Sequence, residues 1–201
     1  MSDWLTDTRD SYDTVAVSYA EYTRGLLDSL PYVRAALRLF AEQVNGPVLD
    51  VGCGPGEVTA VLRDLGMDVA GIDLSPAMIE LARRNHPGIR FEVGSMTEPL
   101  GTSAAGILAW WSLIHIPDGD VPTVFAHFRD ALEPDGLLMV GFHVGDETRL
   151  KTQGYGGHPM RVHVHLRPPE RVVEWLKAAG FTVEARWLLG DDGAVLFARR
   201  G

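Results

Sequence analysis

The chain has little cysteine, little positive charge and no long apolar segment. Its single cysteine, Cys53, excludes an internal disulfide framework. No apolar run approaches the roughly 18 residues of a membrane-spanning helix, and the acidic stretch 1–7 lacks the apolar core of a secretory signal. These features favour a cytoplasmic protein that has no membrane partner.

The charge balance argues against a nucleic-acid substrate. The chain has 18 Lys and Arg against 27 Asp and Glu, a formal net charge of -9. Proteins that bind nucleic acid through its phosphates normally show a basic patch, but the densest basic clusters here are the pairs Arg83-Arg84 and Arg199-Arg200. We therefore expect a small-molecule substrate, no nucleic-acid partner, and a monomer or homodimer.

The length and composition predict a single globular domain over residues 1–201. The chain is 46% hydrophobic and 22% charged, and it is too short for two ordinary domains. Its first 45 residues are predicted to form a helical cap. Tyr12, Val15, Tyr19 and Tyr22 share one helical face, and a second helix is expected over 31–44.

From Gly46 onward, strands and helices alternate. Strands are expected at 48–51, 68–73, 89–93, 105–111 and 137–143, and helices at 57–65, from Pro76 to before Pro87, and at 121–132. This alternation predicts an α/β fold, with a parallel sheet covered by helices on both faces. After a helix at 169–179, strands 181–189 and 194–199 are separated only by Gly190–Gly193 and must be antiparallel.

A glycine-rich turn follows the first strand and indicates a ligand site. Gly52-Cys53-Gly54-Pro55-Gly56 lets the backbone approach a ligand closely. A dinucleotide fingerprint would need glycine at position 57, where this chain has Glu57. Asp50 favours an amino-acid or sulfonium ligand over a pyrophosphate. Asp73 ends the second strand, 21 residues after Gly52, where a carboxylate can accept two ribose hydroxyls.

The segments 48–56, Gly71-Ile72-Asp73-Leu74-Ser75-Pro76-Ala77-Met78 and Gly94-Ser95-Met96 resemble the class I, S-adenosylmethionine-dependent methyltransferases. The resemblance covers about residues 10 to 200. It implies a Rossmann-like seven-stranded sheet in the order 3-2-1-4-5-7-6 with strand 7 antiparallel, S-adenosyl-L-methionine as cofactor and S-adenosyl-L-homocysteine as product. The core would then span 46–201, with a substrate-side insertion at about 143–168.

The resemblance also implies roles for individual residues. Gly52, Cys53 and Gly54 would contact the methionine part of the cofactor, and Asp73 the ribose. Leu74 and Met78 would pack on the adenine, with core packing as the alternative. Further cofactor contacts are implied at Ser95 and Met96 along the adenine edge, Trp111, Ser112 and Leu113 near the methyl donor, and Tyr19 on the closing N-terminal helix. Many family members have Asp in place of Ser95. Cys53 is interpreted as structural.

His115 is the candidate general base. It follows the fourth strand, in the loop expected to face the donor methyl, and an ordinary histidine titrates near neutral pH. A base is needed only for a hydroxyl, an activated carbon acid or a protonated amine as acceptor. The alternative is a structural histidine that holds the loop.

The segment 143–168 is expected to cover the substrate pocket. It contains four of the seven histidines: His143, His158, His163 and His165. We predict His143, His158 and Arg161 as substrate-binding residues. His163 and His165 alternate along a predicted strand, so a metal site is conceivable, but we predict hydrogen-bonding and stacking roles and no metal.

Three other functions compete with methyl transfer to a small molecule. A nicotinamide-dependent oxidoreductase could use a similar sheet, although Glu57 and the final hairpin argue against it. A non-catalytic protein could bind S-adenosylmethionine or S-adenosylhomocysteine, and Trp110 and Trp111 blocking the pocket would support that function. A family member could also use the cofactor for other chemistry.

Overall fold

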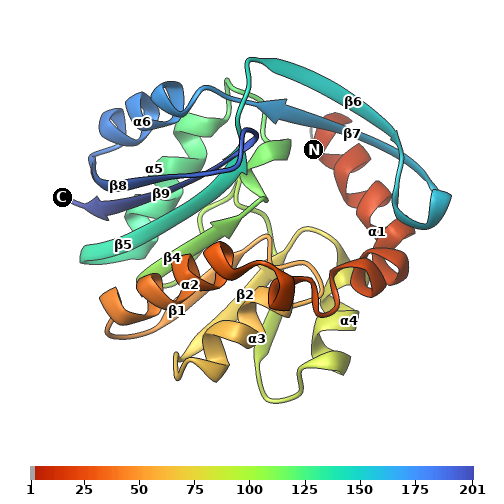
Figure 1. Cartoon of the computed structure of the whole chain (residues 1–201), viewed down its shortest axis with the longest axis horizontal. Helices are drawn as coiled ribbons and strands as arrows, with labels where there is room; N and C mark the ends of the chain where they lie inside the picture. Colours follow the sequence, from red (N-terminus) through yellow and green to blue (C-terminus); the bar gives the residue numbers. More distant parts are fainter. Residues whose placement is uncertain (1–2) are drawn as a thin grey trace.

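The computed structural model describes residues 3–201, and residues 1 and 2 of the predicted cap lie outside the described residues. One seven-stranded sheet has the order β3-β2-β1-β4-β5-β9-β8 (Figure 1). Its strands are β1 (Val48–Val51), β2 (Val69–Asp73), β3 (Arg90–Val93), β4 (Ala104–Trp110), β5 (Leu132–His143), β8 (Phe181–Leu189) and β9 (Gly193–Arg200). The first five are parallel, and β9 is antiparallel to both β5 and β8. The predicted α/β fold and strand order are confirmed.

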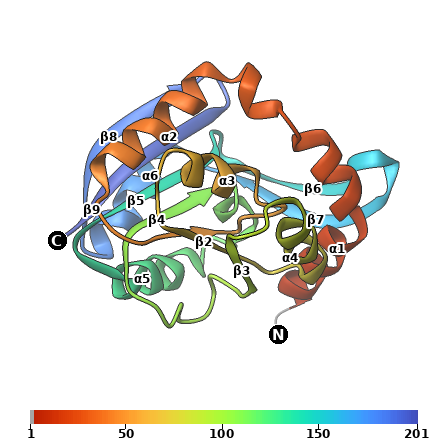
Figure 2. The same ribbon diagram turned by 90° about the horizontal axis from the view of Figure 1, so that it is seen from below.

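Helices cover both faces of the sheet (Figure 2). The helices α5 (Val121–Ala131) and α6 (Pro169–Ala178) bury Phe125, Phe128 and Leu176 against one face. On the other face lie α2 (Pro31–Gln43) and α3 (Glu57–Asp64), which bury Phe40 and Leu62. The helix α4 (Pro76–Asn85) packs against β2 and β3. Short 3₁₀ helices are η1 (Leu26–Ser29), η2 (Leu113–His115) and η3 (Tyr155–Gly157).

Local sequence explains the element ends near the ligand site. Ser75 caps α4 by accepting a hydrogen bond from the backbone N–H of Met78 at 3.1 Å, and Pro76 occupies the first turn. The strand β5 begins at Leu132, five residues earlier than expected from the sequence. Residues 134–136 lie inside it as an irregularity, where Asp135 has a φ of 59°.

The segment 143–168 forms a separate two-stranded sheet from β6 (Glu147–Gln153) and β7 (Pro159–Leu166). Figures 1 and 2 both show this sheet beside α1 (Asp3–Thr23). The backbone N–H of Arg161 donates to Ser11 Oγ at 2.8 Å. Asp13 accepts hydrogen bonds from Ser75 Oγ at 2.5 Å and the Ala77 N–H at 3.0 Å. The helix α1 therefore bridges β7 and α4. Within residues 3–201, no helix combines the length and apolar character needed to cross a membrane.

Candidate cofactor and acceptor site

The glycine loop lies where the carboxyl ends of β1, β2 and β4 meet. The backbone N–H groups of Gly52 and Cys53 both donate to the Ile72 carbonyl, at 2.8 and 3.0 Å. Gly52 has a φ of +77°, and a Cβ there would lie 2.2 Å from the Ser112 Cβ. Only glycine fits this position, because any side chain would both strain the backbone and collide with the loop after β4.

Asp50 lies buried directly beneath this loop. Its Oδ2 accepts a hydrogen bond from Thr59 Oγ1 at 2.6 Å, while Oδ1 has no hydrogen-bond partner among the described residues. Burial raises the pKa of the Asp50 carboxyl to about 7, despite the opposing effect of the Thr59 hydrogen bond. Because a buried carboxylate oxygen without a partner is energetically costly, a cationic hydrogen-bond donor that contacts it would bind favourably.

Asp73 ends β2 and organises the backbone around it. Its Oδ2 accepts from the Gly54 N–H and its Oδ1 from the Ser75 N–H, both at 2.8 Å. Burial raises the pKa of Asp73 to about 6, while these two N–H groups oppose the shift. Each carboxylate oxygen has a second lone pair with which it can accept a hydroxyl group.

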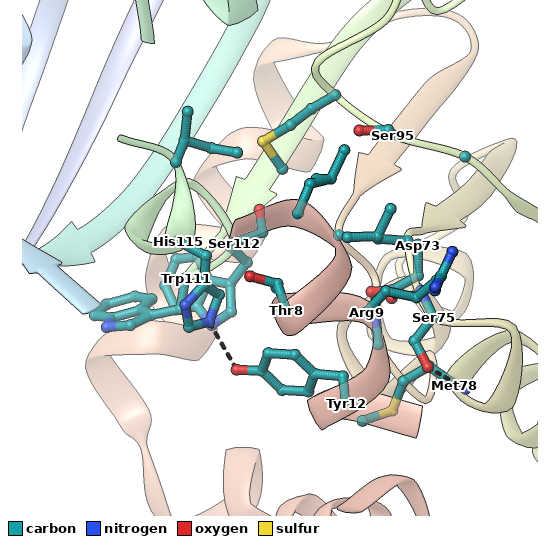
Figure 3. Close-up of a pocket in the computed structure, with 18 of the residues that line it drawn as sticks. Thr8, Arg9, Tyr12, Asp73, Ser75, Met78, Ser95, Trp111, Ser112 and His115 are labelled. Carbon is teal, nitrogen blue, oxygen red and sulfur yellow. Dashed lines mark hydrogen bonds between the residues drawn. The ribbon is translucent and has the colours of Figure 1, made fainter. Parts of the chain in front are cut away.

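The first pocket opens beside Asp73, and we call it the nucleoside pocket. Figure 3 shows Asp73, Ser75, Met78 and Ser95 around it, with Thr8, Arg9 and Tyr12 reaching in from α1. The predicted residues that line it are Tyr19, Gly52, Gly54, Asp73, Leu74, Met78, Ser95, Met96, Trp111, Ser112 and the candidate base His115. The Ser95 hydroxyl is already hydrogen-bonded to Thr97 Oγ1 at 2.7 Å.

A second pocket of about 460 Å³ adjoins the first, and we call it the acceptor pocket. It is lined by Asp50, Cys53 and Pro55 at and beneath the glycine loop and by several aromatic side chains. The residues common to both pockets are Tyr12, Tyr19, Gly52, Gly54, Trp110 and Trp111. Of the predicted cofactor residues, Asp50 and Cys53 line only this second pocket. Burial raises the pKa of the Cys53 thiol, which agrees with a structural role.

His115 is buried, and both of its ring nitrogens have partners. Nδ1 lies 2.8 Å from the His163 carbonyl oxygen, which requires the proton on Nδ1. Nε2 lies 2.7 Å from the Tyr12 hydroxyl, which then donates to it (Figure 3). Burial lowers the pKa of His115 to about 4 and raises that of Tyr12. His115 therefore ties three elements together: η2, α1 and β7.

Trp111 is held by an unusual backbone and two contacts. Its φ is 51°, which is sparsely populated for a non-glycine residue. The indole Nε1 donates to His143 Nδ1 at 3.2 Å, and a Cβ at Gly141 would lie only 2.6 Å from the ring. The adjacent Ser112 donates through Oγ to the Val51 carbonyl at 2.6 Å. These contacts fix the loop between the two pockets.

The predicted substrate residues do not gather in one place. His143 lines the acceptor pocket, whereas His158 and Arg161 line neither pocket. Arg161 is exposed and pairs with Asp7 of α1 at 3.0 Å. His165 is hydrogen-bonded to Thr148 at 2.8 Å. Residues 3–201 contain no group of three or more His, Cys, Asp or Glu side chains placed to hold a metal ion.

Four further residues lie at or around these pockets and are not among the predicted site residues. Tyr12 shares the helical face of Tyr19, as its spacing in the sequence indicates. Tyr155 of η3 and Asp192 of the turn between β8 and β9 line the acceptor pocket, and their positions depend on long-range folding. Arg167 is almost fully buried, with its Nε 2.8 Å from Asp118 and its NH1 and NH2 donating to the carbonyls of Leu113 and Ile116. It thereby holds the backbone around His115.

The sheet with its final antiparallel hairpin, and two pockets meeting at the glycine loop, define an α/β protein of the methyltransferase class. A family model described as a methyltransferase domain matches residues 19–186. The chain belongs to this family, and the family resemblance inferred from the sequence is confirmed. The family match argues against the nicotinamide-dependent oxidoreductase.

Individual relatives agree with this assignment. The chain is 32% identical to a malonyl-[acyl-carrier protein] O-methyltransferase of Xylella fastidiosa over 135 residues, 64% of this chain and 43% of that protein. It is also 32% identical to a trans-aconitate 2-methyltransferase of Sinorhizobium medicae over 133 residues, covering 63% and 49%. The DhpI–SAH complex superimposes with a TM-score of 0.83 at 22% identity, covering 98% of this chain and 97% of that one. The chain spans about half the length of the curated relatives it matches.

Proposed function

We propose that this chain transfers a methyl group from S-adenosylmethionine to a small-molecule acceptor. The observation that carries the proposal is a pair of pockets meeting at Gly52, Gly54 and Trp111, with the unpartnered Asp50 oxygen at the base of one. This arrangement supports binding of a two-part cofactor, with its nucleoside in the first pocket and its amino-acid part beside Asp50 in the second, while the aromatic part of the second pocket is left for the acceptor.

The residues present fit such a cofactor. The ammonium group of the cofactor's methionine part suits Asp50 Oδ1, which otherwise remains buried without a partner. The ribose hydroxyls suit the remaining lone pairs of Asp73. Leu74 and Met78 offer apolar surface for the adenine, and Ser95 and Met96 lie along the same pocket. These assignments stay proposals for each residue.

Bound S-adenosylmethionine supplies a methyl group on a positively charged sulfur, which is a good leaving group. The chain's own residues would align the acceptor and exclude water. Tyr12 and Tyr19 of α1 line both pockets, which supports a role for that helix in closing over the bound cofactor. Trp110 and Trp111 line the acceptor pocket and leave it open, which favours catalysis over the non-catalytic alternative.

The geometry around His115 supports a positioning role more directly than proton abstraction. Its Nδ1 proton is held by the His163 carbonyl, and its Nε2 accepts from Tyr12. With its pKa lowered to about 4, the imidazole is a weak base near neutral pH. His115 would therefore aim the Tyr12 hydroxyl at the junction of the pockets. In this role His115 holds the Tyr12 side chain in place, because the Tyr12 hydroxyl donates its proton to His115 Nε2.

The relatives do not identify the acceptor, because their names specify different acceptors, malonyl-[acyl-carrier protein] and trans-aconitate.

We also propose that the chain forms one domain, with residues 1–45 as a cap on the core 46–201 and the insertion at about 143–168 contacting that cap. The cytoplasmic location, the absence of a nucleic-acid partner and the monomeric or homodimeric state stay predictions from the sequence.

Two measurements test the proposal. Calorimetry with S-adenosylhomocysteine should show binding that Asp73→Ala weakens, while NAD should not bind. Incubation with methyl-labelled S-adenosylmethionine and a panel of small acceptors, followed by mass spectrometry, should show a labelled product. Binding of the homocysteine product without transfer to any acceptor would favour the non-catalytic function, and binding of NAD instead would contradict the proposed cofactor.

A further inference from the structure

The acceptor pocket has aromatic walls contributed by three distant parts of the chain. Tyr19 and Tyr22 come from α1, Tyr155 from η3, and Trp110 and Trp111 from the end of β4. The ring centroids of Tyr19 and Tyr155 are 4.7 Å apart, and those of Tyr22 and Tyr155 are 5.2 Å apart. The two tryptophan rings lie 4.6 Å apart. Such walls offer flat apolar surface to a ligand ring.

The same pocket has no positively charged wall. Among the described residues that line it, none is Lys or Arg. His143 is the one histidine lining it, and burial lowers its pKa, while its Nδ1 accepts a hydrogen bond from Trp111 and therefore carries no proton. Lys151 lies outside the lining, with its Nζ 4.0 Å from the centre of the Tyr155 ring. An anionic acceptor would find no cationic side chain among these described lining residues.

Three carboxylates line the pocket instead: Asp50, Glu57 and Asp192. Asp50 lies beneath the glycine loop on the side proposed for the cofactor's ammonium group. Glu57 lies 3.7 Å from His86. Asp192 is exposed, and its charge acts on His143 at the outer wall. The electrostatic character of the acceptor side is therefore neutral to negative.

We propose that the acceptor is a flat, ring-bearing molecule that has no negative charge, and that the pocket discriminates against carboxylates and phosphates of similar shape. The inference rests on the proposed function, because it assigns to the acceptor the aromatic part of the second pocket, which the cofactor's amino-acid part leaves free. Discrimination follows from two features together. The aromatic walls contact any flat ring, and a buried anion would lose its water without gaining a cationic side chain as partner.

The test uses three probes that share one ring system: 2-naphthol, 2-naphthylmethylamine and 2-naphthoate. Their affinities for the full chain are measured by calorimetry at pH 7.5, with saturating S-adenosylhomocysteine. We expect the carboxylate to bind at least tenfold more weakly than either other probe. The inference would be overturned if 2-naphthoate did not have the lowest affinity of the three probes, or if none of the three bound.

Matched variants locate the effect in this pocket. Tyr22→Leu should lower the affinity for all three probes at least threefold. Tyr32 is a similarly exposed tyrosine on α2 outside the pocket, and Tyr32→Leu should leave these affinities unchanged. Asp192→Asn should reduce the ratio of the dissociation constant of 2-naphthoate to that of 2-naphthol at least threefold, whereas Asp191→Asn should leave this ratio unchanged. Equal effects within either pair contradict the assignment.

The affinity for S-adenosylhomocysteine is measured first and separately. If it fails to bind, the proposed function fails, whatever the probes show. If it binds while the carboxylate probe is not disfavoured, only the acceptor class is wrong. The two conclusions can therefore be tested independently.

Discussion

Replacing Asp50 with asparagine should stabilise the chain without ligand and weaken cofactor binding at the same time. The carboxyl is 1% exposed and its pKa is about 7, compared with 3.8 for an unperturbed aspartate. The folded state therefore binds the proton more tightly than the unfolded state. Stability should decline as the pH rises from about 4 to about 7, and the full penalty should be present above pH 7.

The size of this penalty follows from the shift. A displacement of about three pH units, at about 1.4 kcal/mol per unit, gives roughly 4 kcal/mol at pH 8. Asparagine keeps an oxygen that can accept the Thr59 hydrogen bond and removes the charge. We expect Asp50→Asn to unfold at a higher urea concentration than the unmodified chain at pH 8, and to lose most of that advantage at pH 4.

Cofactor binding should respond in the opposite sense. An ammonium group beside Asp50 needs the ionised carboxylate, so the dissociation constant of S-adenosylhomocysteine should rise about tenfold per pH unit below pH 7. In Asp50→Asn this dependence should flatten, and affinity at pH 8 should fall about 10- to 100-fold, as expected for loss of a charge-assisted hydrogen bond. Calorimetry across pH 5.5–8.5 measures both effects.

The control is Asp64→Asn, which removes an exposed carboxylate of α3 that pairs with Arg63. It should change neither the pH dependence of unfolding nor the affinity. The reasoning would be refuted if Asp50→Asn destabilised the chain equally at pH 4 and pH 8. A dissociation constant that is independent of pH in the unmodified chain would refute the ammonium assignment by itself.

Three further substitutions probe the loops around the site. His115→Ala should strongly lower turnover while the affinity for the cofactor is nearly unchanged. If His115 acts through Tyr12, Tyr12→Phe should lower turnover to the same extent in steady-state kinetics. A fully active Tyr12→Phe would instead favour His115 as the base. Gly52→Ala should abolish measurable S-adenosylhomocysteine binding in calorimetry, whereas Gly66→Ala, with a φ of +91° and nothing within 4 Å, should keep it. Arg167→Met should lower the free energy of unfolding by about 3 kcal/mol in urea titrations, because buried carbonyl groups lose their donor; an unchanged midpoint would show that the loop does not need it.

The sequence predicted which residues line the nucleoside pocket better than which residues line the acceptor pocket, for a physical reason. Asp50, Gly52 and Asp73 each lie at or just beyond the carboxyl end of a parallel strand, so chain order alone brings them to one edge of the sheet. The strand β6 was missed because nearly all its side chains are exposed, which removes the alternating pattern by which half-buried strands are recognised. Tyr155 could not be placed without knowing that this hairpin packs against α1.

The histidine-rich segment shows how residue type can mislead when the backbone contact is unknown. His163 contributes its carbonyl oxygen to His115, and His165 binds Thr148 on the neighbouring strand. Neither contact could be predicted from the chemistry of the imidazole side chain alone. Arg167, by contrast, acts through its side chain, which is buried against the carbonyls of the 113–116 loop. The insertion therefore acts on the site chiefly through its backbone and through Arg167, by fixing the loop that presents His115 to Tyr12. Because Tyr12 belongs to α1 and His115 to η2, a movement that separates α1 from η2 would break the hydrogen bond between Tyr12 and His115.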